Sequence, residues 1–505
     1  MRNHATNKAS LFWQLLTLAL GILAAPSMVV PRVAGAGEAL PQVSGPLTMQ
    51  QSVDLAIQHS RKIKASAADE RIMTSMRREA ASGFFPQASA NGYLVKQNMT
   101  PNIYNSAGDT MARNYQFFGT NNGQDLNLTA MWPIFSGGRT YYGYKAAGAR
   151  ADAATLMLRG TEVEVAMQAR LDFIAAAREQ ENARVTGELL AQTEERLRVS
   201  REEFAAGRVA RVNVLRDEAE MANVIQMDTM VRNQAELALI SLKTTMGLDL
   251  ASPITLGESL QYVATSVSVA DGIQQALASH PDVQVAAKEV EAAESEVRAS
   301  YGRYLPEISA TWMYDWQKIW NKNESSSYPS GYSAGLVVTI PIFDGFMREG
   351  AIGTARAKRD KASEQEMLAR QQVTKDVNQA ALMLTSAEKT VEASKKGLDQ
   401  AEEQFRIVQE RYTSGRGIQV EILDAQTAFT RAGFNGVAAV ADYPTARAIR
   451  RKAAGRVREV WRRRGAFRSA SGHDCVNLCE WNRIPSRGRL HFPPLLSRPR
   501  SVHVG

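Results

Sequence analysis

Apolar and polar residues alternate along two parts of the chain, and a period of two is typical of β-strands. In the first part the apolar positions are Leu126, Leu128, Ala130, Trp132 and Ile134, with Asn127 and Thr129 between them. The second part repeats the pattern with Ile308, Ala310, Trp312, Tyr314 and Trp316, and then with Ala334, Leu336, Val338, Ile340 and Ile342. We therefore predict two strand hairpins, at about 86–135 and about 305–343. Alternation alone does not distinguish a membrane hairpin from a half-buried hairpin of a soluble protein.

The long tracts between these segments have the period of an α-helix. No Pro occurs from Arg139 to Phe204, and apolar residues recur there at helical spacing: Val163, Met167, Leu171 and Ile174. A second tract shows the same spacing with Val373, Val377, Ala381 and Leu384. At a rise of about 1.5 Å per residue, such a tract forms a helix on the order of 100 Å long. A helix of this length cannot fold back into a compact core.

The chain contains the same arrangement twice. Residues 85–90 match residues 305–310 at an offset of 220, and residues 133–137 match 341–345 at an offset of 208. The second offset persists to residues 204–208, which match 412–416. Each half reads as helix, strand, loop, strand, long helix, turn and helix. We assign the first repeat to residues 37–260, with its turn at 207, and the second to 261–455, with its turn at 415.

Both ends of the chain differ from the repeats. Residues 1–36 have early basic residues, an apolar run and the cleavage pattern Ala34-Gly35-Ala36, which predicts a signal peptide. No Cys follows the apolar run, so lipidation is not predicted. Residues 456–505 are rich in Arg, have no period and are predicted to be disordered, and a shifted reading frame is one hypothesis for their origin. Pro444 predicts a kink or a helix end just before this tail.

Net charge does not indicate a nucleic-acid partner. The formal net charge is +8, yet the body between residues 37 and 452 holds 46 basic and 49 acidic side chains. The basic excess therefore lies in the two ends. Cys475 and Cys479, both in the tail, form a lone C-x3-C pair that lacks the second ligand pair of a zinc site. The body also lacks phosphate-binding, nucleophile and metal-ligand motifs, so we expect no enzyme activity, no cofactor and no metal.

The hairpins constrain how the chain assembles. After the first 36 residues no run of about 18 apolar residues recurs, which leaves strands as the elements that could cross a membrane. An open four-stranded sheet in lipid would leave its edge groups unpaired, and barrels close at about eight strands or more. Several chains must then share one barrel. Two copies would give eight strands and three would give twelve, and the pattern itself does not choose between them.

The doubled L/F-P strand entries, the P-I-F-S/D-G strand exits and the two aromatic-x-x-Gly turns resemble those of the TolC-like outer-membrane efflux proteins, or outer membrane factors. The resemblance extends from about Leu47 to Tyr443. It implies a membrane α+β fold class: a homotrimeric 12-stranded β-barrel, with four strands per chain, continued by a long α-helical periplasmic barrel. It also implies an outer-membrane location that extends into the periplasm, in contact with outer-membrane lipid.

The resemblance assigns a periplasmic gate to the ends of the long helices. By the shared Tyr-x-x-Gly spacing, acidic gate residues fall on Glu421 and Asp424, and Tyr412 resembles a latch tyrosine. The latch pattern departs at Gly417, where the family has an arginine. In the first repeat Asn213 stands at a usually acidic position, and Asp217, one turn further on, could replace it. The alternative is that these charges belong to a solvated helix face.

The two turns also resemble the family's docking edge for a periplasmic adaptor. Gly suits a chain reversal that needs positive φ, and we predict that the helices restart at Val209 and Ile418. The predicted docking residues are Gly207, Arg208, Val209, Gly415, Arg416 and Gly417. Their minimal role is turn formation.

The function implied is that of a passive outer-membrane channel in a tripartite export system, for efflux or type I secretion. Its partners would be two further copies, a periplasmic adaptor or membrane fusion protein, and an inner-membrane pump or ABC exporter, with no nucleic acid. The alternative is a periplasmic adaptor or a structural coiled-coil protein, since those also combine a signal peptide with long helices. The transported substrate does not follow from the sequence.

Overall fold

The computed structural model describes residues 45–95, 122–258, 260, 262, 269–320, 330–414 and 416–455. All of these belong to one compact unit, Met1–Arg456. The predicted signal peptide, the Arg-rich tail with its two cysteines, and Gly415 lie outside the described residues.

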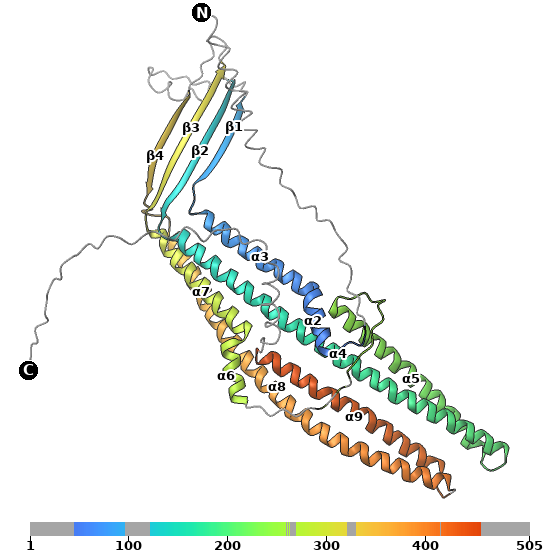
Figure 1. Cartoon of the computed structure of the whole chain (residues 1–505). Helices are drawn as coiled ribbons and strands as arrows, with labels where there is room; N and C mark the ends of the chain where they lie inside the picture. Colours follow the sequence, from blue (N-terminus) through green and yellow to red (C-terminus); the bar gives the residue numbers. More distant parts are fainter. Residues whose placement is uncertain are drawn as a thin grey trace, which may run out of the picture. The chain divides into compact units, whose positions relative to one another are not determined.

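Four strands form one antiparallel sheet in the order β1-β2-β3-β4 (Figure 1). They are β1 (Gln87–Val95), β2 (Asn122–Ser136), β3 (Glu307–Trp320) and β4 (Ser330–Thr339). The two predicted hairpins therefore pair with each other through β2 and β3. β4 ends at Thr339, earlier than predicted, so Ile340 and Ile342 lie beyond the strand. β1 and β4 are the two edges of the sheet, and they run in opposite directions.

The register separates an apolar face from a polar one. Leu128 lies opposite Tyr314 and Ala130 opposite Trp312, so the alternating apolar residues share one face as predicted. On the other face Asn91 Nδ2 donates to Asn127 Oδ1 at 3.0 Å. Trp312 remains 42% exposed, so the described residues of this chain do not bury the apolar face. This arrangement differs from a hairpin packed into a soluble core, where that face would be covered.

Each repeat contributes one very long helix. α4 (Arg139–Ala205) and α8 (Met347–Thr413) both have 67 residues, which corresponds to on the order of 100 Å. They are followed by α5 (Arg211–Met246) and α9 (Gln419–Ala453). The shorter helices are also duplicated: α2 (Met49–His59) and α3 (Arg61–Ser82) correspond to α6 (Val269–Ser279) and α7 (Pro281–Tyr301), and α7 is followed by the 3-10 turn η2 (Gly302–Tyr304). Among the described helices, none combines the length and apolarity that a membrane span requires.

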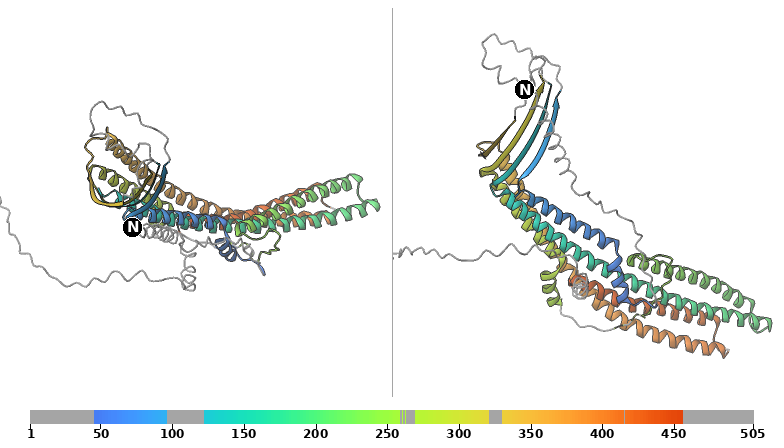
Figure 2. Two further views of the ribbon diagram at one scale, coloured as in Figure 1. Left: turned by 90° about the horizontal axis from the view of Figure 1, so that it is seen from above. Right: turned by 45° about the horizontal axis from the view of Figure 1, so that its top comes forward.

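The long helices pack as a layer. α4 contacts α3, α5, α7 and α9, and α8 contacts α7 and α9, so the pairs α4–α5 and α8–α9 run side by side (Figures 1 and 2). Many buried positions on α4 are alanines, including Ala153, Ala166, Ala169 and Ala176. Because Ala has only a methyl group, neighbouring helices can approach closely along this face.

Helix α9 does not end at Pro444. It continues to Ala453, so of the two predicted alternatives, a kink or a helix end, the helix end is wrong. Proline removes one backbone donor and strains the preceding turn. Burial on both sides of Pro444 opposes this cost: the Tyr443 side chain is 1% exposed and packs edge-on against Tyr262, and Ala446 is 4% exposed.

Candidate functional site

The turns at the ends of the long helix pairs, residues 206–210 and 414–418, form what we call the tip. Both turns close with the same capping bond: Arg208 N donates to Glu203 O at 2.8 Å, and Arg416 N donates to Arg411 O at 2.9 Å. Gly207 has a φ of 74°, a conformation that glycine adopts without strain. The two bonds are equivalent at an offset of 208, so the repeat extends to single hydrogen bonds at the tip.

The helices after the turns begin slightly later than predicted. α5 begins at Arg211 after Ala210, and α9 begins at Gln419 after Ile418. Ala210 and Ile418 are again equivalent positions. Gly417 also has a steric reason to be glycine, since a Cβ there would lie 3.0 Å from the backbone nitrogen of Tyr412. Its backbone N–H donates to Arg411 O at 3.0 Å. A side chain at this position would require its neighbours to shift by a few tenths of an ångström, so glycine fits the turn closely.

A buried polar cluster, which we call the tip cluster, joins three helices near these turns. Arg196 Nε on α4 lies 3.1 Å from Asp217 Oδ1 on α5, and the two side chains are 13% and 1% exposed. Arg196 also donates to the side-chain oxygen of Gln426 on α9. Charged side chains are buried at this depth only when they are paired. Arg196 therefore connects the α4–α5 pair to α9.

Tyr412 lies beside this cluster. Burial of its hydroxyl raises the pKa of Tyr412 above the ordinary value, the charges of Asp217 and Glu203 act in the same direction, and Arg196 opposes them. The structure thus brings together Tyr412 and Asp217, two of the predicted gate residues. Asp217 is paired with Arg196, however, which the sequence did not indicate.

The other predicted gate residues occupy the start of α5 and α9. Glu421 is half-buried and its Oε2 lies 3.6 Å from Arg411 Nη2 at the end of α8. Asp424, one turn later, is exposed. Asn213 contributes its backbone: its carbonyl accepts a 2.9 Å hydrogen bond from Gln419 Nε2. A second contact thus links α5 to α9, in addition to the one through Arg196.

Arg196 and Gln426 were missed by sequence analysis. They are 230 positions apart, and each stands among charged or polar neighbours at ordinary helical spacing. The only signal available was that a long polar side chain falls on the buried side of a helix, and helical phase is hard to follow over 67 residues.

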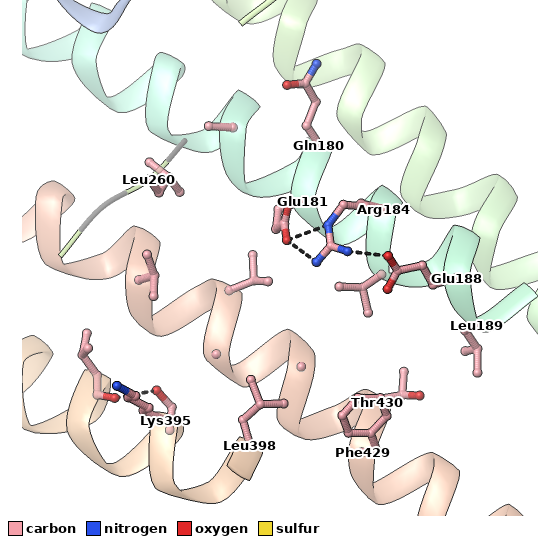
Figure 3. Close-up of a pocket in the computed structure, with 18 of the residues that line it drawn as sticks. Gln180, Glu181, Arg184, Glu188, Leu189, Leu260, Lys395, Leu398, Phe429 and Thr430 are labelled. Carbon is pink, nitrogen blue, oxygen red and sulfur yellow. Dashed lines mark hydrogen bonds and ion pairs between the residues drawn. The ribbon is translucent and has the colours of Figure 1, made fainter. Parts of the chain in front are cut away.

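A groove of about 830 Å³ lies further from the tip, between α4, α8, α9 and the segment that joins the repeats. Figure 3 shows Arg184 on the wall of this groove, between Glu181 and Glu188. Its Nη2 lies 2.6 Å from Glu181 Oε1 and its Nη1 lies 2.5 Å from Glu188 Oε1. Leu398 and Phe429 supply apolar lining on the opposite side. Within the described ranges there is no cluster of His, Cys, Asp and Glu suited to a metal ion.

Comparison with known proteins agrees with this geometry. The family model described as outer membrane efflux protein matches residues 52–248 and 272–456, which includes both repeats. Protein CyaE of Bordetella pertussis is 25% identical over 434 residues, 82% of this chain and 86% of the relative. Outer membrane efflux protein BepC of Brucella suis is 24% identical over 379 residues, 75% of this chain and 79% of the relative. The CmeC outer membrane channel of Campylobacter jejuni has the same fold, with a TM-score of 0.70, 16% identity, and coverage of 81% and 85%.

A four-stranded sheet with an exposed apolar face, continued by two helices of 67 residues that each pair with a shorter helix, is the fold that this chain shares with that outer membrane channel. The chain belongs to the outer membrane efflux protein family. It is an outer-membrane channel for efflux or type I secretion that extends into the periplasm, and it is not an enzyme. The predicted fold class is confirmed, and the alternative of an adaptor or structural coiled coil is excluded because the family match covers both repeats.

Proposed function

We propose that the tip is the gate of this channel, and that three copies of Glu421 and Asp424 surround its narrowest opening. The observation that carries the proposal is their placement on the first turns of α9, directly after the chain reversal and at i, i+3 spacing on one helix face. Six carboxylates around a narrow opening would attract cations and hold them there. The chain itself is then a passive conduit, open or shut according to how α8 and α9 sit against α4 and α5.

The double variant Glu421→Gln/Asp424→Asn tests this role. In planar bilayers we expect block by a divalent cation such as Mg²⁺ to need a roughly tenfold higher concentration, because the charge that concentrates cations at the opening is removed. Single-channel conductance is expected to change as well. The matched control is Asp399→Asn/Glu402→Gln, an exposed acidic pair at the same spacing on α8. Equal cation block in both double variants would reduce Glu421 and Asp424 to surface charges.

We further propose that the two turns of the tip dock a periplasmic adaptor, which connects the channel to an inner-membrane pump or ABC exporter. Arg208 and Arg416 are both exposed at equivalent positions, so a partner would meet six arginines around the trimer. We expect Arg208→Glu/Arg416→Glu to abolish co-purification of the cognate adaptor while the trimer persists. Retained adaptor binding in this variant would show that the turns only reverse the chain.

A further inference from the structure

An apolar patch lies just after the edge strand β4. Four side chains of this segment are exposed: Ile342 by 91%, Phe343 by 74%, Phe346 by 71% and Met347 by 60%. We call these four residues the corner patch. Phe343 and Phe346 contact each other edge-on, with ring centroids 5.7 Å apart. An exposed aromatic pair of this kind, next to an unpaired strand edge, indicates an interaction surface.

The equivalent corner of the first repeat, residues 133–139, is covered in part by the same chain: Gly137 is buried, while Ile134 and Phe135 are 51% and 42% exposed. Gly137 is in close contact with η2: a Cβ at Gly137 would lie 2.1 Å from Gly302 O and 2.9 Å from Leu305 Cβ. Arg139 Nη2 also pairs with Glu307 Oε2 at 2.5 Å. The cover of the first corner is thus residues 302–307, which begin the second hairpin.

The second corner has the same backbone but lacks this cover at its glycine, and of residues 302–307 it is Tyr304 that contacts Arg348 and Glu349 beyond the turn. Gly345 has a φ of 67°, close to the 63° of Gly137, and Phe346 has a φ of 68° where Gly138 has 79°. A Cβ on Gly345 would meet nothing within 4 Å. Phe346 thus has a left-handed backbone conformation, which costs free energy for a bulky residue. The Phe346 ring packs edge-on against Phe343 and remains 71% exposed, so this contact buries little of the side chain.

The corner patch is held in shape by Arg348. This buried side chain pairs with Asp344 at 2.9 Å and donates to the carbonyls of Pro341 and Ile342 at 3.1 Å and 3.2 Å. Its guanidinium also lies over the Tyr304 ring, 4.7 Å from the centroid. The patch is therefore preformed before any partner arrives.

We propose that the corner patch is an interface between copies, in which it packs against Phe84 and Phe85 of the next chain. The proposal depends on the trimeric fold class, in which the β4 edge of one copy pairs with the β1 edge of the next. Residues 82–87 are equivalent to the covering residues 302–307 at the offset of 220, and they lead directly into β1. Phe85 is 65% exposed and available for this contact, and Phe84, which packs edge-on against Tyr144 of its own chain, still leaves 41% of its surface exposed.

The contact between copies cannot repeat the contact within the chain. Ser82 stands where the first corner uses Gly302, so the backbones cannot approach as closely as Gly137 and Gly302 do. The interface between copies must then be wider, and side chains must fill it. Phe346, in place of Gly138, supplies that volume. This would offset the backbone strain at Phe346.

Disulfide cross-linking tests which surface covers the patch. In full-length chains carrying Cys475→Ser and Cys479→Ser, we expect Phe85→Cys/Phe346→Cys to form covalent dimers and trimers under oxidation on a denaturing gel. Phe85→Cys alone and Phe346→Cys alone should give none. A native trimer that forms no covalent oligomer with the paired cysteines would mean that the patch faces lipid, and it would overturn the proposal without affecting the channel function.

The variant Phe346→Gly provides a second test, in which the direction of the change in the trimer's dissociation temperature distinguishes the two possibilities. Glycine relieves the strain at positive φ, so an uncovered Phe346 predicts equal or greater heat resistance of the trimer in Phe346→Gly. An aromatic side chain buried between copies predicts the opposite, a lower dissociation temperature in SDS. We expect the lower temperature. The matched variant Phe346→Ala, which keeps the strain and loses the ring, should lower it further.

Discussion

Arg196→Leu is expected to lower the stability of the tip by about 3–5 kcal/mol, because it leaves the carboxylate of Asp217 buried without its partner. The Asp217 side chain is 1% exposed, so water cannot replace the guanidinium without local opening. The substitution also removes the hydrogen bond to Gln426, which together with the Gln419–Asn213 bond links the α4–α5 pair to α9. Helix α9 should then separate more readily, and the variant channel should be open for a larger fraction of time in planar bilayers.

Limited proteolysis of the tip in membrane-embedded trimers measures this effect. Arg198→Leu is the matched control: Arg198 lies two residues away on α4, is 55% exposed, and among the described residues forms ion pairs with Glu195 and Glu202 of the same helix. Such surface pairs contribute about 0–1 kcal/mol. The double variant Arg196→Leu/Asp217→Leu should recover much of the lost stability, since both charges are gone. If Arg196→Leu and Arg198→Leu are cleaved at equal rates, the tip cluster has no role in holding the helices together.

Gly137→Ala is expected to block assembly of the sheet onto the helices, at a cost of about 2–5 kcal/mol from overpacking and left-handed strain together. The new Cβ would lie 2.1 Å from Gly302 O, a distance that requires the backbone to move. Because this contact joins the two repeats at the base of β2 and β3, the displacement would reach both hairpins. The yield of heat-modifiable trimer in outer-membrane fractions is the measurement.

Gly138→Ala separates the two causes. Its φ of 79° imposes the same kind of strain, but its Cβ would meet only the Tyr142 ring, at 3.5 Å. We expect Gly138→Ala to form a trimer of lower stability and Gly137→Ala to form no trimer. Normal trimer yield from Gly137→Ala would mean that the two backbones are not in tight contact in the assembled channel.

The repeat made most of the fold predictable. Once residues 133–137 were matched to 341–345, the two long helices had to be of similar length, and both have 67 residues. The strand faces followed from alternation because side chains point to opposite faces at successive positions. Boundaries were less accurate. β4 ends before Ile340, α5 begins at Arg211 rather than Val209, and α9 continues through Pro444.

The candidate site was predictable only in part. The turns were visible because Gly-containing reversals leave a local signature, and the structure gives both the same capping bond. The gate and docking roles of the tip residues stay predictions. Arg196 and Gln426 left no signature, because a contact between residues 230 positions apart depends on the relative rotation of two helices. The pairing of Asp217 with Arg196, rather than with a latch tyrosine, was hidden for the same reason.

By itself, the sequence determined the periodic and repeated features of this protein: two hairpins with one apolar face each, long uninterrupted helices, and reversals at glycine. These depend on neighbouring residues, so the order of residues is enough to specify them. Only the tertiary structure decided that β2 pairs with β3, that Gly137 packs on Gly302, and that Arg196 joins three helices. Such contacts depend on how distant segments meet, and burial makes a small set of them far stronger than their residue types suggest.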